Sequence, residues 1–457
     1  MDDTLSPTVT HTIAADQVTP VRAYAALRSF APRQSSFLLE SMRPETPGGR
    51  FSIVAYRAQS ESLYPAGGDA LSMLIDELSA SNEGPPSGTV RPPAEALARL
   101  LSRATAGFIA YDAIHPMLKI KPWESEGPMA RTIQGATVVV FDHLAGTCTI
   151  AGPTRSSVNR CAWEMTRGPE LRPIRAPDPQ RTPEHVDVSM SDETFAARVR
   201  RAQEKIAAGQ VEQLSLCRIF RTPPRNAETL DVYRALRLLD PSPYLFFFDF
   251  VESPMTPPQT LLGVAAGLLV QGDDGAMSPL RIGEQIRASF PAAATTGSPR
   301  AQAAQLIREL EAEPRGLFGG AIGFVLPGGQ IGLAAADRTV VLEHAYLQVA
   351  GAAAVRAGTD GEAAAEEARQ RAMVGLAAIR AAQDAADARE AADAEKRAKE
   401  AAKAEAASAS TQDAGVQDAT ASGGAGTDEP APRAGDEADG ATDLGAGDDP
   451  AGAGENA

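Results

Sequence analysis

The sequence from Phe318 to Val355 is FGGAIGFVLPGGQIGLAAADRTVVLEHAYLQVAGAAAV. Three apolar runs, Phe318–Val325, Ile331–Leu342 and Ala345–Val355, follow one another with only short turns between them. Runs of this length, bounded by turn residues such as Gly328-Gly329, predict strands. Because the strands are not separated by regular helical crossovers, the pattern favours an α+β architecture with large antiparallel sheets over a doubly wound fold.

The sequence upstream of these strands alternates helical and strand patterns. Ser191 is placed to cap a helix that ends near Gly209, since its side chain can accept from the first free amides. The strand predicted over Val211–Phe220 puts Leu214 and Leu216 on one face and Gln213 on the other. Similar patterns predict a helix over Leu230–Leu239, strands over Tyr244–Phe250 and Leu261–Val270, and a helix opened by Ser298-Pro299.

Composition divides the chain into five predicted parts. Five prolines among charged residues indicate an extended linker, and the Ala- and charge-rich stretch has high helix propensity but little apolar surface to bury. The final stretch lacks the apolar residues needed to offset the entropy of ordering, which predicts disorder. The parts are an N-terminal domain (18–167), a Pro-rich linker (168–188), a second globular domain (189–382), a charged helix (383–408) and an acidic tail (409–457).

The composition also excludes some classes of protein. With 43 Lys+Arg against 59 Asp+Glu, the formal charge is −16, which argues against nucleic-acid and anionic-membrane partners. Three cysteines are too few for a disulfide framework. The start of the chain lacks a signal-peptide pattern, and no apolar run approaches the roughly 18 residues of a membrane span. We therefore expect a cytoplasmic protein.

Searches for general catalytic motifs find little. The chain has no Walker loop, no GxGxxG after a strand, no HExxH and no GxSxG. The five histidines are scattered without metal-ligand spacing, so structural or surface roles are expected for them.

Seven short segments, in order along the chain between Ser36 and Ala372, nevertheless resemble the motifs of one family. That family is anthranilate synthase component I, within the chorismate-utilising enzymes. The segments are SFLLES at 36–41 with GGRFS at 48–52, AYD at 110–112, the helix and strand from 191 to 220, YRALR at 233–237 leading to PSPY at 241–244, FPA at 290–292 with GSPR at 297–300, RGLFGGAIG at 315–323, and Arg338-Thr339.

The resemblance implies a sandwich fold and a set of site residues. Gln213 stands where members that add water to chorismate carry a basic lysine. A neutral amide cannot deprotonate water, so the aminating branch is the better match. Arg338, Gln213 and Arg300, the last in place of a lysine, would be the catalytic positions. The implied substrate-binding residues are Gly297, Phe318 (in place of tyrosine), Gly319 and Gly351.

The resemblance also predicts an incomplete magnesium site. The family segment that carries a metal-binding glutamate and a catalytic histidine is missing, because residues 278–283 lead almost directly to Ser289-Phe290-Pro291. Of the second glutamate pair only Glu366 is matched, and Ala363 stands at the other position. Magnesium needs several hard oxygen ligands, so we expect weak or absent catalysis.

A second site implied by the family is better matched. Its regulatory tryptophan pocket would use Glu40 and Ser41 together with the turn Pro241, Ser242, Pro243 and Tyr244. Asp240 replaces the asparagine that precedes this turn. Acceptors for an amine beside apolar walls suit an aromatic amino acid, although the same residues could simply shape a turn.

Three functions therefore remain open on the sequence. The first is an impaired anthranilate synthase component I, which would bind chorismate and Mg²⁺ and receive ammonia from a separate glutaminase subunit. The second is a non-catalytic regulator that binds tryptophan or a protein partner. The third is an enzyme that resembles aminodeoxychorismate synthase, whose diagnostic lysine would fall in the missing segment.

Overall fold

The computed structural model describes residues 8–46, 49–66, 68–80, 93–124, 127–254, 256–271 and 279–420. The chain forms two units, Met1–Ala392 and Asp393–Ala457, and each is considered by itself. In the described residues, no helix is both long enough and apolar enough to cross a membrane.

One antiparallel sheet of 16 strands organises the first unit. Its long path runs in the order β1 (Val9–Ala14), β8 (Thr147–Gly152), β7 (Thr137–Asp142), β3 (Phe51–Tyr56), β2 (Ser36–Glu40), β11 (Leu245–Phe250), β12 (Gln259–Gln271), β15 (Ile331–Glu343), β14 (Ala321–Val325), β5 (Thr105–Ile109), β6 (Ala130–Gln134) and β4 (Ser60–Tyr64). Off this path, β10 (Gln213–Thr222) pairs with β16 (Tyr346–Val355), β13 (Gly297–Ser298) and β9 (Asp187–Val188). The α+β class with large antiparallel sheets is confirmed.

Both predicted globular parts of the chain contribute to this one sheet. Strand β2 pairs with β11, with Glu40 opposite Leu245, and β5 pairs with β14, with Ile109 opposite Ala321. The segment between them, 168–186, contains no helix or strand. The division at 168–188 thus marks an extended connection in the chain, while the sheet itself is shared.

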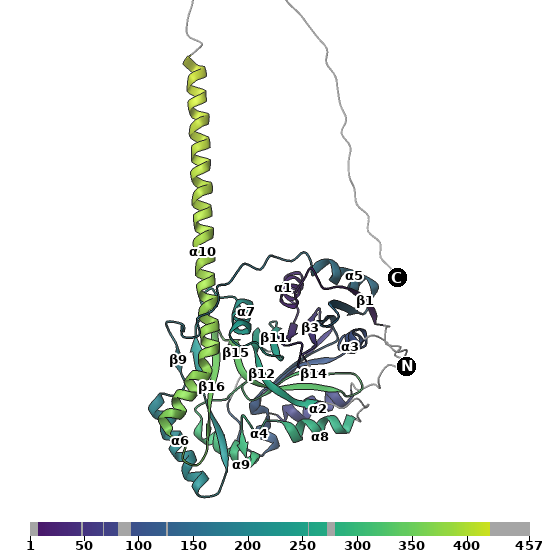
Figure 1. Ribbon diagram of the computed structural model, residues 1–457, viewed down its shortest axis with the longest axis vertical. Coiled ribbons are helices and arrows are strands. Elements are labelled where there is room, and N and C mark those ends of the chain that lie inside the picture. The colour runs from purple at the N-terminus through teal and green to yellow at the C-terminus, as the bar shows by residue number, and fades with distance from the viewer. Residues whose placement is uncertain are drawn as a thin grey trace, which may run out of the picture. The chain divides into compact units, whose positions relative to one another are not determined.

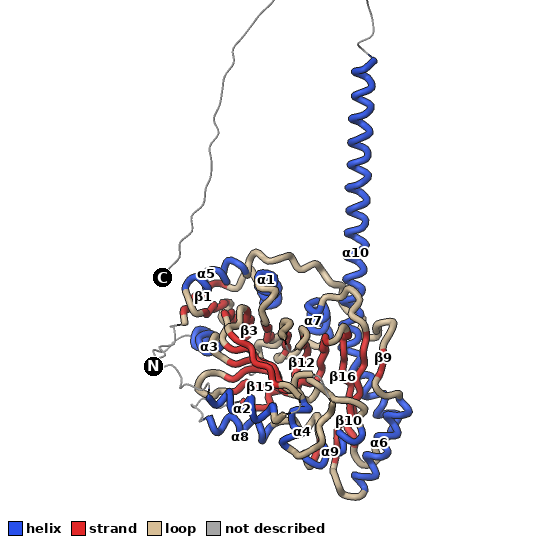
Figure 2. Tube along the Cα trace, turned by 180° about the vertical axis from the view of Figure 1, so that it is seen from behind, coloured by secondary structure: helices blue, strands red, loops and turns tan. Residues whose placement is uncertain are grey.

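Helices cover the outside of the sheet. Figures 1 and 2 show α1 (Pro20–Phe30), α5 (Arg155–Glu164) and α7 (Thr229–Leu239) on one side, and α2 (Ala70–Ala80) beside α8 (Pro279–Ser289) on the other. The other helical elements are α3 (Pro93–Leu101), η1 (Tyr111–Ala113), α4 (Ile114–Met117), α6 (Asp192–Ala207), α9 (Arg300–Leu310) and α10 (Gly361–Thr420).

The core lies in layers that follow this arrangement. An inner cluster contains Phe37 of β2, Phe108 of β5 and Phe248 of β11, so opposite parts of the curved sheet pack on each other. The Phe37 and Phe248 rings stack with centroids 5.0 Å apart. Separate clusters fill the space beneath the outer helices. This is the sandwich with external helices that the resemblance implied.

Most of the predicted elements are present, with shifted ends. Ser191 caps α6 by accepting from the Thr194 amide at 3.2 Å. Strand β14 begins at Ala321, later than the predicted Phe318, because Gly316 and Gly319 adopt positive φ angles of 59° and 76° in the preceding turn.

The described C-terminal helix differs in its bounds from the predicted division of the chain. The charged helix predicted over 383–408 is part of one helix, α10, which begins at Gly361. The helix also continues to Thr420, through residues predicted to be disordered from 409. The remainder of the predicted tail, 421–457, lies outside the described residues.

Candidate functional site

Gln213, predicted as a catalytic position, lies at the start of β10. It has the predicted orientation, on the face opposite Leu214 and Leu216, which point into the core beneath α6 and α9. Its Oε1 accepts a hydrogen bond from Arg356 Nε at 2.9 Å. The side chain is therefore held at the edge of the sheet by a neighbouring arginine.

Arg338 lies elsewhere, on β15. Its guanidinium is paired with Asp240 at 3.0 Å and approaches Asp337 at 3.6 Å. Asp240 immediately precedes the Pro241–Tyr244 turn. The structure thus places Arg338 beside the predicted regulatory turn, where its charge is already neutralised.

Arg300 and Glu366, the remaining catalytic and metal candidates, have structural partners of their own. Arg300 donates to the carbonyls of Arg287, Ala288 and Phe290, which closes the C-terminal end of α8. In the described part of the chain, no hydrogen bond or ion pair joins any two of Gln213, Arg300, Arg338 and Glu366.

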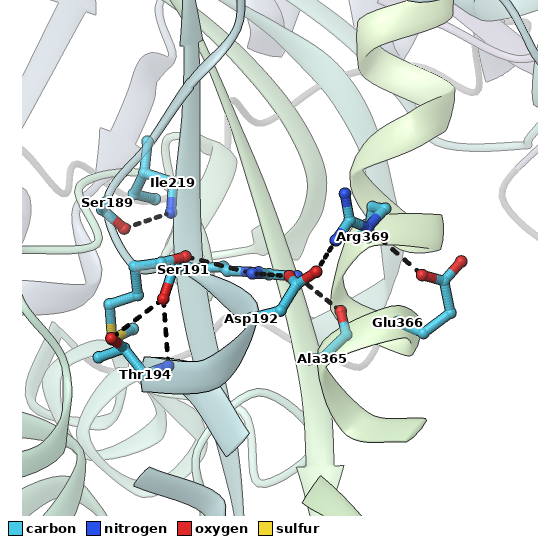
Figure 3. A network of polar contacts seen from close by, with 10 residues as sticks. Ser189, Ser191, Asp192, Thr194, Ile219, Ala365, Glu366 and Arg369 are labelled. Atoms are coloured by element: carbon cyan, nitrogen blue, oxygen red, sulfur yellow. Dashed lines mark hydrogen bonds and ion pairs between the residues drawn. The ribbon is translucent and has the colours of Figure 1, made fainter. Parts of the chain in front are cut away.

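Figure 3 shows that Glu366 belongs to a network at the start of α10. Its Oε2 lies 3.3 Å from Arg369 Nε, and Arg369 in turn bonds to Asp192. The buried Arg218 of β10 donates to Asp192 Oδ1 at 2.6 Å and to the Ala365 carbonyl at 2.7 Å. Because Arg218 connects β10, α6 and α10, the network holds these elements together.

This environment does not fit magnesium. The Glu366 and Asp192 carboxylates are both paired with arginines, whose positive charge repels a metal ion, whereas Mg²⁺ needs several free oxygen ligands in octahedral geometry. Over the described ranges, no group of three His, Cys, Asp or Glu side chains is placed to hold a metal ion. No catalytic step through magnesium is therefore derived.

The predicted substrate-binding residues are packed into the protein interior or turns. Phe318 is buried in a cluster with Cys217, Ile219, Ala350 and Ala352. A Cβ on Gly297 would lie 2.2 Å from the Gln213 carbonyl, and one on Gly351 would lie 2.1 Å from the Ala368 carbonyl on α10. Gly319 supplies a positive φ in the turn before β14. Each of these residues has a structural reason to be present, and substrate contact remains a prediction.

A buried charge cluster behind Phe318 was missed by the sequence analysis. Arg315 donates to Glu311, to the Thr295 carbonyl at 2.6 Å and to the Ser215 carbonyl at 2.6 Å. Glu311 also accepts from the Cys217 amide at 2.8 Å. The i,i+4 spacing of Glu311 and Arg315 is the local signal that could have indicated this pair.

Asp112 lies next to this cluster and is fully buried. Its Oδ2 accepts from the Gly316 amide at 2.8 Å. Burial disfavours the charged carboxylate and raises the Asp112 pKa to about 7, although the Gly316 amide and Arg315 oppose the shift.

The residues of the predicted regulatory site, by contrast, are brought together. Glu40 ends β2, and the Pro241–Tyr244 turn leads into the paired strand β11. The Met42 amide donates to the Ser242 carbonyl at 3.0 Å, which closes the turn onto the end of β2. Ser41 lies between them, with its Oγ accepting from the Arg43 amide at 3.2 Å.

The Glu40 carboxylate is the electrostatic centre of this region. It accepts from Tyr233 Oη at 2.9 Å and from Arg237 at 2.8 Å. Burial raises the Glu40 pKa, and the Arg237 charge and the Tyr233 hydrogen bond oppose that shift. In the described chain, Arg237 Nε has no hydrogen-bond partner, so this guanidinium retains a free donor.

Comparisons with known proteins decide the family. The model of the chorismate binding enzyme family matches residues 34–279 and 277–377, most of the chain. The chain belongs to the chorismate-binding enzyme family. The two matched pieces meet at 277–279, at the position where the sequence analysis located a missing segment.

Relatives and solved structures of this family agree. The chain is 26% identical to anthranilate synthase component 1 of Streptomyces coelicolor, over 81% of this chain and 88% of that protein, and 24% identical to that of Thermus thermophilus, over 81% and 97%. The Streptomyces alignment spans 472 positions, more than the length of this chain, so this chain lacks residues that its relative has.

The fold is that of solved members. It resembles anthranilate synthase component I of Streptococcus pneumoniae with a TM-score of 0.58 at 19% identity, covering 72% of this chain and 93% of that one. It also resembles the isochorismate synthase MenF of Escherichia coli, with a TM-score of 0.53 at 12% identity and coverage of 82% and 95%.

Proposed function

We propose that this chorismate-binding family member resembles anthranilate synthase component I without its lyase activity, and that it binds tryptophan at the Glu40–Tyr244 region. One contrast supports the proposal. The regulatory-site residues are joined by hydrogen bonds between β2 and the turn before β11. The candidate catalytic residues are each bound to separate structural partners.

The chemistry of the region suits an α-amino acid. The Glu40 carboxylate and Ser41 Oγ can accept hydrogen bonds from an ammonium group, and the partly exposed Arg237 guanidinium places a positive charge beside them for a carboxylate. A zwitterion needs both kinds of group a short distance apart. Pro243 and Tyr244 offer partly buried apolar surface of the kind that an indole ring covers.

Lyase activity in this family would require magnesium. Loss of the ring hydroxyl of a dicarboxylate substrate would need the charge that Mg²⁺ supplies in this family, and Glu366 lies beside Arg369. Binding of a glutaminase subunit, which would deliver ammonia to an active synthase, remains a prediction. The non-catalytic function does not require such a partner.

Two measurements on the purified full chain test the proposal. Calorimetric titration with L-tryptophan should show saturable binding that Glu40→Gln weakens by about tenfold, because a charge-assisted hydrogen bond is lost. The matched control, Glu45→Gln, removes an exposed carboxylate nearby and should leave the affinity unchanged. Absence of tryptophan binding by the folded protein would contradict the regulatory function.

The second measurement follows anthranilate fluorescence with chorismate, Mg²⁺ and excess ammonium at alkaline pH. Because ammonium supplies ammonia directly, the assay needs no glutaminase. A non-catalytic protein should give a signal no greater than that without protein. Magnesium-dependent turnover that Gln213→Ala abolishes would instead establish the enzyme and overturn the non-catalytic proposal.

A further inference from the structure

A cavity of about 220 Å³ lies at the opposite end of β10 from Gln213. It is bounded by the start of β12, the ends of β10 and β15, and the loop 313–317. None of the predicted catalytic, substrate, metal or regulatory residues lines it. The predicted site residues therefore lie outside its lining, although Phe318 belongs to the same buried cluster as Ile219 and Ala350, which line it.

One wall of the cavity is apolar. It is formed by Phe108 of β5, Leu261 of β12 and Val341 of β15, with Ile219 of β10 beside them. A short hydrocarbon chain could be buried against this wall, with the polar end of the same molecule facing the opposite side.

The polar wall contains two hydrogen-bond acceptors that lack donors. Gln259 is 7% exposed, and its Nε2 donates to Glu343 Oε1 at 3.3 Å, which fixes which end of the amide is the donor. Its Oε1, and Oε1 of Glu313, are buried with no partner in the described chain. Buried acceptors without donors are rare, because desolvation is then uncompensated.

The charges that line the cavity favour a cation. Asp112, Glu313 and Glu343 provide carboxyl groups, against the guanidinium groups of Arg221 and Arg315. Arg315 is paired with Glu311 and donates to two backbone carbonyls. Arg221 is paired with Glu313 at 2.7 Å. The Gln259 and Glu313 oxygens therefore remain the buried acceptors of this wall that have no donor in the described chain.

We propose that this cavity binds a small primary alkylammonium compound, with its ammonium group against Gln259 and Glu313 and its carbon chain against Phe108 and Leu261. An ammonium group brings three donors and one positive charge, which matches both the unpartnered acceptors and the excess of carboxyl groups. A neutral molecule of the same shape would supply fewer donors and no charge.

The test compares n-butylammonium with n-butanol, by saturation-transfer NMR and calorimetry on the full chain. Butylammonium should bind saturably and butanol at least about tenfold more weakly. Gln259→Met, which keeps the volume but removes the acceptor, and Glu313→Gln should each weaken butylammonium binding by about tenfold. The matched control is Glu170→Gln, which removes an exposed carboxylate from the 168–186 segment and should have no effect.

Equal binding of the two probes, no binding of butylammonium, or binding unchanged in both cavity variants would overturn the proposal. Circular dichroism of each variant separates loss of binding from loss of folding. Because the tryptophan titration uses another ligand at another site, it succeeds or fails independently.

Discussion

Arg315 shows how strongly this protein depends on single buried charges. Its side chain is 2% exposed and its partner Glu311 4%. Removing one member of such a pair leaves the other charged, buried and unpaired. We expect Arg315→Met to lower the free energy of unfolding by about 3–5 kcal/mol, measured by urea denaturation.

The control for that measurement is the exposed pair of Arg371 and Glu367, which has the same i,i+4 spacing at 2.9 Å. Surface pairs of this kind contribute little, so Arg371→Met should change the free energy of unfolding by less than about 1 kcal/mol. Similar losses for both variants would show that Arg315 is not sequestered from water.

Asp112 predicts a dependence of stability on pH. Its pKa is raised from 3.8 to about 7 in the folded state, so folding favours the protonated form. The stability from this group is present at low pH and is lost as pH rises through about 7, by at most about 1.4 kcal/mol per pH unit. Burial lowers the His115 pKa from 6.5 to about 4, so folding favours its neutral form. The stability from this group is lost as pH falls below 6.5.

Comparison with Asp112→Asn isolates the aspartate, because His115 is common to both proteins. Asparagine still accepts from the Gly316 amide but does not titrate. The stability of the wild type relative to the variant should therefore fall between about pH 4 and pH 7 and level off above that, measured by urea denaturation at each pH. A difference that is constant with pH would contradict a raised Asp112 pKa.

At the scale of elements, Gly351 determines how closely α10 approaches the sheet. A Cβ there would lie 2.1 Å from the Ala368 carbonyl and 3.1 Å from the Ala372 Cβ. The Ala368 carbonyl is part of the backbone and cannot move aside as a side chain could, so Gly351→Ala must displace the helix. We expect the free energy of unfolding to fall by about 1–3 kcal/mol, measured by thermal or urea unfolding. Gly68→Ala, at an exposed position with open space around it, is the matched control and should change stability by less than about 0.5 kcal/mol.

The sequence predicted the positions of helices and strands better than it predicted which strands pair. Periodicity located α6, β10 and β16 to within a few residues, because each pattern is local. The pairing of β2 with β11 joins residues about 200 positions apart, and no local pattern specifies it. The surroundings of Arg338 were unpredictable for the same reason, since its partner Asp240 lies about 100 positions away, in the connection between α7 and β11.

At the scale of the whole molecule, a single sheet carries both proposed sites on different strands. Strand β10 carries Gln213 at one end and borders the alkylammonium cavity at the other, and β11 follows the regulatory turn. The strands beside the predicted tryptophan-binding residues also form the core, so the fold holds those residues in place.

The long helix α10 allows this division of the chain to be tested. Its buried residues begin at Gly361 and include Leu376, Ile379 and Ala382, and the last of them in the described range is Ala386. A chain ending at Ala392 should therefore unfold at the same temperature as the full chain and bind tryptophan equally well. A chain ending at Asp360 removes the whole apolar strip and exposes the sheet beneath it, so it should lose its cooperative thermal transition. Destabilisation of the longer truncation by several degrees would show instead that residues beyond Ala392 contribute to the stability of the first unit.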